Sequence, residues 1–227
     1  MDPPASSPWS APGTVAGFAR SPPNAVLMRF AEAELRRSPR AHVLDLGCGA
    51  GRNAVPLARL GCDVVGVDLS WPMLSAAGRR ASDDGVAGRL HLAQAPMDRL
   101  PALDCSFDIV IAQGIWNLAR SAAEFQRAVA EAARVARPCA GLFVFTFSRN
   151  TFPPEAEPVP GEPFVFTQFA GEPQCFLTEA QLVGELRAAG FTREPGGPLT
   201  EYNRTRPGAL QRRGPPVIYE GAFRYRG

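Results

Sequence analysis

The 227-residue sequence contains no lysine, so all 24 of its basic residues are arginines, and the formal net charge is only +2. A chain so close to neutral lacks the basic surface of a protein that coats nucleic acid, and we expect no nucleic-acid partner. Histidine is also scarce, with only His42 and His91. Because general acid–base catalysis uses histidine more often than any other residue, this shortage narrows the mechanisms open to the chain.

No apolar run approaches the roughly 20 residues that a membrane span needs. The first residues lack both the basic and the apolar part of a signal peptide. The five cysteines are widely spaced and include no CxxC pair, which argues against a zinc site or a disulfide framework. We therefore expect a reduced, cytoplasmic protein without membrane contact or bound metal. Both a monomer and a homodimer are compatible with the sequence.

Residues 1–23 are rich in proline, serine, alanine and glycine, and they include Trp9 and Phe18. Two interpretations stay open for this leader. It is disordered, or it folds over a site as part of a lid with the two aromatic side chains as anchors. From Asn24 to Ser38 the apolar spacing predicts a helix, with Asn24 as the N-cap and Pro39 after its end.

From residue 41 onward, short apolar stretches alternate with helical patterns. Continuously apolar strands separated by helices are typical of a parallel sheet that is covered on both faces. Ser121 and Glu124 predict a capping box for the last of these helices, Pro138 is expected to end it, and Cys139 is expected to be buried. The pattern predicts strands over 41–47, 62–70, 88–95, 106–113 and 140–148, and helices over 49–61, 71–85 and 121–138, with Ser70 as the cap of the second of these helices.

The alternation stops at residue 149. Residues 149–177 show no periodicity, and a stretch this long without regular structure is usually a functional loop such as a lid. A helix follows over 178–190, with a capping signal at Thr178, and two last strands are predicted over 191–202 and 217–225. The sequence thus predicts one domain over 24–227 with an inserted lid segment at 149–177.

The most informative stretch is VLDLGCGAGRN, which starts at Val43. A strand reaches Asp45, three glycines follow at alternate positions from Gly47 to Gly51, and a helix then begins. Glycines let the backbone approach a ligand, and an acid at the end of the next strand, here Asp68, can accept hydrogen bonds from ribose hydroxyls. A dinucleotide site needs a further glycine where this chain has Arg52. The acid at Asp45 suits a ligand with a positive charge, which disfavours an NAD-dependent oxidoreductase.

DLGCGAGRN, VVGVDLS, and Leu100-Pro101 followed by SFDIV resemble the motifs of class I S-adenosylmethionine-dependent methyltransferases. The resemblance covers residues 24–147. It implies a Rossmann-like, doubly wound α/β fold with a seven-stranded sheet of order 3-2-1-4-5-7-6, in which strand 7 is antiparallel. It also implies S-adenosyl-L-methionine as the cofactor.

The resemblance assigns roles by position. Asp45 and the glycine loop would contact the methionine part and the ribose, Asp68 would bind the ribose hydroxyls, and Leu69 would pack on the adenine. Many members carry an acid after the third strand where this chain has Pro96, so the Met97 backbone or the Asp98 carboxylate would take its place. The expected cofactor site consists of Asp45, Gly47, Cys48, Gly49, Gly51, Arg52, Asn53, Asp68, Leu69, Pro96, Met97 and Gln113.

Both histidines lie at the starts of their predicted strands, whereas ligands of a parallel sheet bind at the carboxyl ends. We therefore expect structural roles for both. Either the acceptor ionises easily, or a carboxylate or tyrosine assists, with Glu162, Glu172, Glu201 and Tyr202 as candidates, so the catalytic residue stays unassigned. The candidate substrate-binding residues are Trp116, Arg149, Phe169 and Tyr202, with Arg204 and Arg206 for an anionic group.

We predict S-adenosylmethionine-dependent methyl transfer to a small-molecule acceptor by in-line displacement, driven by proximity and by desolvation of the pocket. Two alternatives stay open. The GRN turn after Gly51 also resembles tellurite-resistance-type methyltransferases, which favours a metalloid acceptor that needs no base, with Cys175 as a soft ligand. The second alternative is a protein that binds the cofactor without catalysis and acts as a partner subunit.

Overall fold

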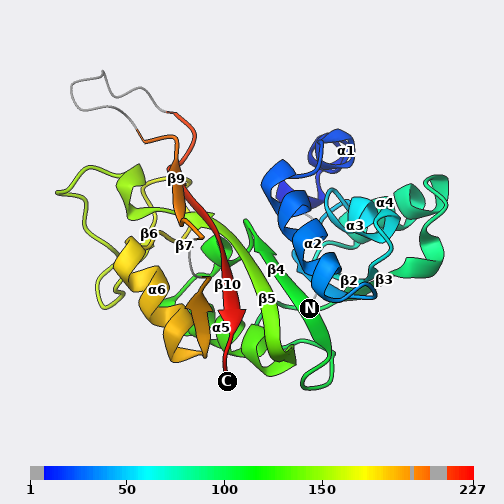
Figure 1. Cartoon of the computed structure of the whole chain (residues 1–227). Coiled ribbons are helices and arrows are strands. Elements are labelled where there is room, and N and C mark those ends of the chain that lie inside the picture. The colour runs from blue at the N-terminus through cyan, green and yellow to red at the C-terminus, as the bar shows by residue number, and fades with distance from the viewer. Residues whose placement is uncertain (1–7, 195–196, 205–213) are drawn as a thin grey trace.

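A mixed β-sheet runs through the centre of the protein in the computed structural model, which describes residues 8–194, 197–204 and 214–227 (Figure 1). The strand order is β3-β2-β1-β4-β5-β10-β8, and β9 also pairs with β10. The first five strands are parallel, and β10 is antiparallel to its neighbours. With β8 as the sixth strand and β10 as the seventh, the predicted order is confirmed. The strands are β1 His42–Leu46, β2 Asp63–Asp68, β3 Leu90–Gln94, β4 Phe107–Gln113, β5 Ala136–Phe147, β8 Phe191–Arg193, β9 Thr200–Tyr202 and β10 Ile218–Tyr225.

The sheet has eight strands instead of seven because the single strand predicted over 191–202 is divided. β8 and β9 both pair with β10, and a proline- and glycine-rich stretch that includes Gly197 and Pro198 lies between them. Proline has no N–H to donate to a sheet, and glycine weakens a strand, so this stretch interrupts the pairing.

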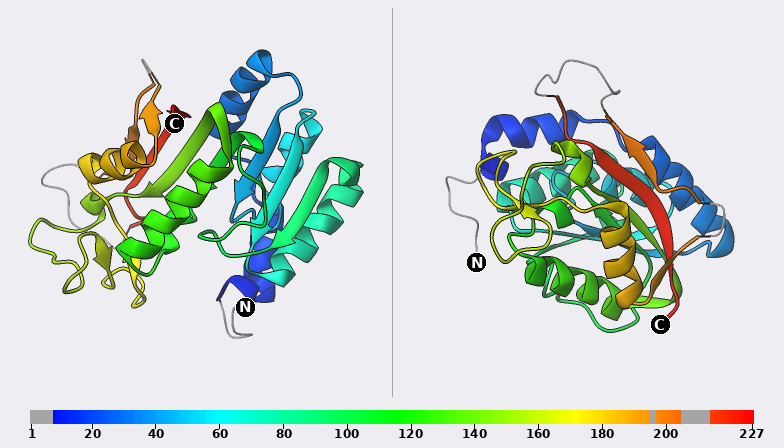
Figure 2. Two further views of the ribbon diagram at one scale, coloured as in Figure 1. Left: turned by 90° about the horizontal axis from the view of Figure 1, so that it is seen from below. Right: turned by 90° about the vertical axis from the view of Figure 1, so that its left-hand side faces the viewer.

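Helices cover both faces of the sheet (Figure 2). One face packs against α2, α3 and α4 through Leu27, Val55 and Leu74. The other face packs against α5 and α6 through Phe125 and Leu182. The helices are α1 Pro12–Arg20, α2 Ala25–Arg37, α3 Ala54–Arg59, α4 Trp71–Asp83, α5 Ala122–Val135 and α6 Glu179–Ala188, with short 3₁₀ turns η1 Pro8–Ser10, η2 Ala87–Arg89, η3 Trp116–Leu118 and η4 Arg149–Thr151. In the described part of the chain no helix is both long and apolar enough to cross a membrane.

The predicted helix caps are confirmed at three helix starts and half confirmed at a fourth. Asn24 caps α2, Ser70 caps α4, and Thr178 forms a reciprocal capping box with Gln181 in α6. At α5 the Ser121 side chain accepts a hydrogen bond from the Glu124 N–H, but the Glu124 carboxylate accepts from Arg120. The second half of that capping box is therefore shifted back by one residue.

The prediction for Pro138 and Cys139 is wrong. α5 ends at Val135, β5 begins at the next residue, and Pro138 lies inside the strand. The pairing of β4 with β5 shifts register between Phe107 and Ile109, and this irregularity accommodates a residue without an N–H. Cys139 is exposed and adopts the left-handed conformation, with φ of 66°.

Residues 149–177 have more regular structure than the sequence predicts. They contain η4 and a small antiparallel sheet of β6 Val165–Phe166 and β7 Gln174–Cys175. Phe166 and Phe176 are buried and pack on the ring of Phe152. This segment therefore forms a small aromatic core of its own beside the end of β5.

Candidate functional site

The loop between β1 and α3 is made of left-handed glycines at the carboxyl edge of the sheet. Gly47, Gly49 and Gly51 have φ angles of 65°, 53° and 74°. Residues with side chains rarely adopt this conformation. At Gly47 there is also no space, because a Cβ would lie 2.7 Å from Ile115 Cδ1. These three positions therefore favour glycine.

Asp68, at the end of β2, orders this loop. Its Oδ2 accepts a hydrogen bond of 2.9 Å from the Gly49 N–H, and its Oδ1 accepts one of 2.8 Å from the Ser70 N–H. Burial raises the pKa of Asp68, and these backbone hydrogen bonds oppose that rise. Since each carboxylate oxygen has two lone pairs, both oxygens keep the capacity to accept a hydrogen bond from a ligand.

Asp45 is a buried acid with an unused oxygen. The Ala54 N–H donates to the carboxyl, but Oδ2 has no hydrogen-bond partner among the described residues. Burial raises the pKa of Asp45 to about 7, with a further rise from Asp68 and a lowering from Arg52. A buried unpaired carboxylate oxygen is costly. It fits a ligand that brings a cation, such as the ammonium group of S-adenosylmethionine.

Asn53 connects this loop to two other elements. Its Nδ2 donates to Gln113 Oε1 at the end of β4, over 3.1 Å, and its Oδ1 accepts from the Asn24 N–H, over 3.0 Å. Asn24 Nδ2 in turn donates to Glu220 Oε1 on β10, over 2.6 Å. The sequence predicts Asn24 only as a helix cap, and no sequence signal links it to Glu220, which lies 196 residues further on.

The expected adenine side of the site presents apolar surface. Leu69 is 40% exposed directly after β2, and Pro96 and Met97 are half-buried after β3. The Gln94 side chain donates to the Leu69 carbonyl, which ties these two strand ends together. Asp98, the alternative adenine partner, forms an ion pair with Arg127 on α5 at 3.0 Å. That pairing occupies the Asp98 carboxylate.

The leader packs on the same loop. The Ser70 hydroxyl contacts the Ser10 hydroxyl at 3.2 Å and the Trp9 carbonyl at 3.4 Å. Phe18 of α1 packs with Met73, and a Cβ at Gly49 would lie 3.8 Å from the Phe18 ring. Residues 8–20 are therefore helical and cover the glycine loop, so the disordered alternative does not describe them.

The structure places two of the four candidate substrate residues in structural roles. Trp116 is fully buried and packs edge-on against Phe125, so it belongs to the core. The Arg149 guanidinium donates four hydrogen bonds to backbone carbonyls of residues 152–156 and lies over the Phe166 ring. Arg149 thus stabilises the loop that follows it and has few N–H groups left to bind a substrate anion.

The other two candidates are accessible. Phe169 is 40% exposed and packs on Phe147 and Phe176, and Tyr202 is 37% exposed at the end of β9. Of the arginines expected to bind an anion, Arg204 pairs with Glu201 at 3.1 Å, and Arg206 lies outside the described residues.

The three candidate carboxylate bases are all engaged. Glu162 accepts the Ala122 N–H at the start of α5, and Glu172 forms an exposed pair with Arg120. Burial acts to raise the pKa of Glu201, but hydrogen bonds from Asn150 and Ser148, together with Arg204, lower it overall. A carboxylate with a lowered pKa is a weak proton acceptor.

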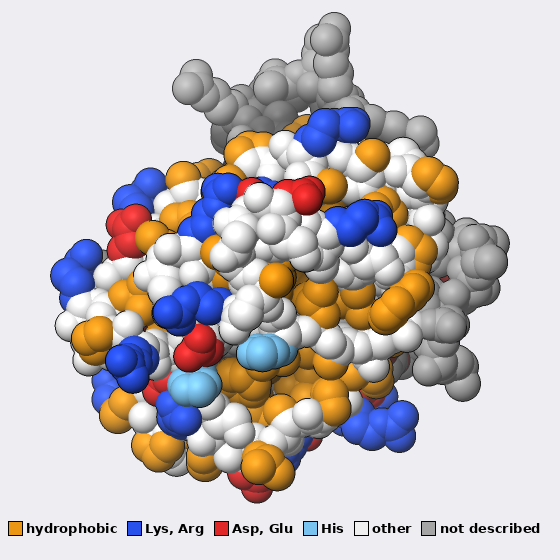
Figure 3. Space-filling view, turned by 90° about the vertical axis from the view of Figure 1, so that its right-hand side faces the viewer, with side chains coloured by type: hydrophobic (Ala, Val, Ile, Leu, Met, Phe, Trp, Pro, Cys, Tyr) orange, Lys and Arg blue, Asp and Glu red, His pale blue; other side chains and the backbone are white. Residues whose placement is uncertain are grey.

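Both histidines are exposed, at the start of β1 and near the start of β3 (Figure 3). They lie at the edge of the sheet opposite the glycine loop, so the prediction of their position is confirmed. No histidine is therefore available at the site, and the proton chemistry of the reaction falls to other groups.

Comparisons with known proteins agree with this geometry. Residues 43–139 match the family model described as methyltransferase domain. A demethylmenaquinone methyltransferase of Parafrankia sp. (strain EAN1pec) is 31% identical over 209 residues, which covers 77% of this chain and 81% of that protein. A ubiquinone biosynthesis O-methyltransferase of Azorhizobium caulinodans is 31% identical over 160 residues, which covers 69% of this chain and 61% of that protein.

Two further demethylmenaquinone methyltransferases match over 45% and 51% of their own length, so the chain spans about half of these relatives. The crystal structure of a SAM-dependent methyltransferase from Methanosarcina mazei has the same fold, with a TM-score of 0.67 at 20% identity over 91% of this chain and 99% of that chain. The chain belongs to the class I S-adenosylmethionine-dependent methyltransferase family. It is a methyltransferase, and S-adenosylmethionine is its cofactor.

Proposed function

We propose that this enzyme methylates a small molecule that carries an aromatic ring hydroxyl, such as a quinol or a phenol. Relatives named for demethylmenaquinone and ubiquinone biosynthesis support this acceptor class. The exposed Phe169, the aromatic core behind it and the absence of histidine from the site are compatible with a flat acceptor that ionises readily. Methylation at the ring oxygen and at a ring carbon are both compatible with this proposal.

The proposed placement of the cofactor rests on Asp45 Oδ2, which has no hydrogen-bond partner in the described part of the chain. We infer that Asp45 holds the ammonium group and Asp68 the ribose hydroxyls, and that Leu69, Pro96 and Met97 contact the adenine. The remaining members of the set are the glycine-loop residues Gly47, Cys48, Gly49 and Gly51, together with Arg52, Asn53 and Gln113. When bound, S-adenosylmethionine supplies a methyl group activated by a sulfonium charge. The protein contributes positioning and exclusion of water.

We expect cofactor affinity to depend on pH through Asp45. With a pKa of about 7, the carboxyl is protonated below neutral pH, and binding a cation requires release of that proton. The association constant should rise up to about tenfold per pH unit between pH 5.5 and 7 and then level off. Calorimetric titrations across this range would measure the slope. Asp45→Asn is the matched control, which should bind weakly and without this slope.

The same raised pKa has a consequence for stability. The folded state binds a proton on Asp45 between its ordinary pKa of 3.8 and about 7, so this group lowers the free energy of unfolding as pH rises through that range. Asp45→Asn should therefore raise the melting temperature of the cofactor-free protein at pH 8 and have little effect at pH 4. Equal effects at both pH values would contradict this assignment.

We also propose that the leader is part of a lid, together with residues 149–177. Phe18 and Met73 pack where α1 crosses the glycine loop. Phe18→Ala should increase the dissociation rate of S-adenosylmethionine by about tenfold, which corresponds to about 1.4 kcal/mol. Stopped-flow displacement would measure the rate. Arg20→Ala, at the exposed end of α1, is the control and should leave the rate within twofold.

No contact among the described residues adds to the sequence resemblance that favours the metalloid alternative. Cys175, its only candidate soft ligand, is buried, and its Sγ contacts the Ala119 carbonyl at 3.3 Å. Burial raises the pKa of this thiol, which keeps it protonated. The proposal of a non-catalytic partner subunit is set aside because the family relationship identifies an enzyme.

The test has two stages. Calorimetry with S-adenosylmethionine, S-adenosylhomocysteine and NAD should show binding of the first two and none of NAD. Release of S-adenosylhomocysteine is then measured with demethylated naphthoquinols, catechols, tellurite and selenite as acceptors. Turnover with the ring hydroxyl compounds alone would support the proposal. Turnover with the oxyanions alone would replace it with the metalloid function.

A further inference from the structure

Tyr202 is an exposed base candidate that forms no ion pair with the described residues, and it lies beside a buried acid. Glu220 on β10 is 5% exposed. In the pairing of β9 with β10, Glu220 lies opposite Thr200 and Ile218 lies opposite Tyr202. This register brings the side chains of Tyr202, Thr200 and Glu220 to the same face of the sheet. The Tyr202 hydroxyl lies close enough to the Glu220 carboxylate and the Thr200 side chain for both to act on its pKa.

Glu220 is also connected to the cofactor site. Its Oε1 accepts from Asn24 Nδ2 at 2.6 Å, and Asn24 is joined through Asn53 to Gln113 at 3.0 and 3.1 Å. Hydrogen bonds, together with the Asn24 backbone, therefore connect Glu220 with the end of β4. Figure 1 shows β9 and the start of α2 at the same end of the sheet, where β5 also ends. A buried carboxylate with an exposed tyrosine at its outer end is suited to accept a proton from a molecule bound at this edge.

We propose that Tyr202 and Glu220 form a proton relay that ionises the acceptor hydroxyl, an inference that rests on the proposed function. The acceptor O–H gives its proton to the Tyr202 oxygen while the Tyr202 proton passes to the Glu220 carboxylate. The acceptor oxygen, or the ring carbon that shares its charge, forms the new bond to the methyl carbon. The carbon–sulfur bond breaks, and its electron pair remains on sulfur. Glu220 later returns the proton to water through Tyr202.

The surroundings of the pair are compatible with this role. Among the described residues, the charged groups that act on Tyr202 are Glu220 and Arg29 of α2, and Asn24 donates to Glu220 from the side of the cofactor loop. Burial raises the pKa of Tyr202, and the Glu220 charge raises it further. Tyr202 thus keeps its proton at neutral pH and can pass it inward only when another proton replaces it.

The test compares Tyr202→Phe and Glu220→Gln with wild type, using catechol and 4-nitrocatechol as acceptors. Catechol keeps its proton at neutral pH, whereas 4-nitrocatechol is largely ionised. Both variants should lose about 100-fold in kcat with catechol and less than fivefold with 4-nitrocatechol. The variants should also lose the acidic limb of the kcat–pH profile for catechol. Tyr225→Phe, on the far end of β10, is the matched control and should behave like wild type.

A second measurement needs no turnover. Tyrosinate absorbance of the cofactor-free protein is followed against pH, and the Tyr202→Phe variant identifies the Tyr202 signal. In Glu220→Gln this signal should titrate at lower pH, and an unchanged titration would overturn the pairing. Equal losses with both catechols would show a structural role and overturn the relay. Absence of wild-type turnover with every ring hydroxyl compound would overturn the acceptor class and the relay together, while cofactor binding would still stand.

Discussion

Replacement of Asp68 by alanine should weaken S-adenosylmethionine binding by at least 100-fold. The carboxylate accepts backbone hydrogen bonds from Gly49 and Ser70, and hydrogen bonds to a charged group contribute about 1.5–3 kcal/mol each. The substitution leaves both N–H groups unpaired, releases the glycine loop, and removes the proposed acceptor of the ribose hydroxyls. Calorimetric titration would measure the loss.

Asp63→Ala is the matched control for this experiment. Asp63 begins the same strand, but it is half exposed and pairs with the exposed Arg89 at 3.2 Å. Exposed pairs contribute less than about 1 kcal/mol, so this variant should bind the cofactor within twofold of wild type. Asp68→Asn keeps one oxygen acceptor, so its affinity for S-adenosylmethionine should lie between those of Asp68→Ala and Asp63→Ala. Wild-type affinity in Asp68→Ala would show that the site is misplaced.

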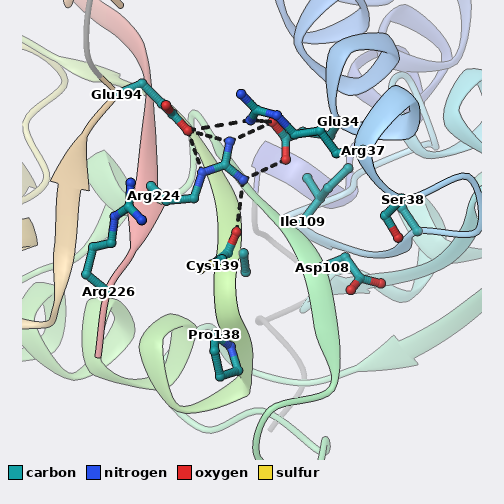
Figure 4. A pocket seen from close by; sticks show the side chains of 12 residues that line it. Glu34, Arg37, Ser38, Asp108, Ile109, Pro138, Cys139, Glu194, Arg224 and Arg226 are labelled. Atoms are coloured by element: carbon teal, nitrogen blue, oxygen red, sulfur yellow. Dashed lines mark hydrogen bonds and ion pairs between the residues drawn. The ribbon is translucent and has the colours of Figure 1, made fainter.

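The largest expected loss of stability comes from Arg224→Met. Arg224 on β10 forms a two-pronged pair with Glu34 of α2, with both bonds at 2.7 Å, and it also bonds Glu194 and the Cys139 carbonyl (Figure 4). Both Arg224 and Glu34 are buried, and removal of one partner of a buried pair costs about 3–5 kcal/mol. Urea unfolding should show a loss of this size.

The double variant Glu34→Met, Arg224→Met tests the source of the stability that Arg224→Met loses. The loss comes either from the missing ion pair or from the buried carboxylate that remains. Arg224→Met leaves the buried Glu34 carboxylate with only its 2.8 Å bond to the exposed Arg37, and most of the cost comes from this carboxylate, so its removal should restore a large part of the stability. Arg89→Met breaks the exposed pair with Asp63 and should cost less than about 1 kcal/mol. A double variant no more stable than Arg224→Met would place the loss in packing instead of charge.

Local signals in the sequence predicted much of the fold. Each parallel strand is an apolar run, and each of the main helix caps is a short side chain before a helical pattern, so both are readable from neighbouring residues. The predictions that proved wrong involve distant partners. Pro138 lies within β5 because the pairing with β4 is irregular there, and the strand predicted over 191–202 is divided because β10 pairs with it in two pieces.

In the candidate site, too, some residues are predictable from their neighbours in the sequence, and others depend on distant partners. The glycine loop, Asp45 and Asp68 lie in one short stretch, so their shared location at the strand ends was predictable. The role of Arg149 was not, since its four carbonyl partners depend on the path of the following loop. Glu220 carries no local signal at all. The role proposed for Glu220 follows only from the pairing of β9 with β10 and from the contact with Asn24.

The position of β10 also bears on synthesis of the protein. This strand is made after the other strands of the sheet, yet it lies inside the sheet between β5 and β8, and its Glu220 accepts a hydrogen bond from the Asn24 side-chain amide. A nascent chain on the ribosome therefore exposes the glycine loop before β10 is available. Without β10, the start of α2 is not held against that loop. Contacts between such distant residues form late in folding. Full cofactor affinity should thus develop only after β10 has left the ribosomal exit tunnel.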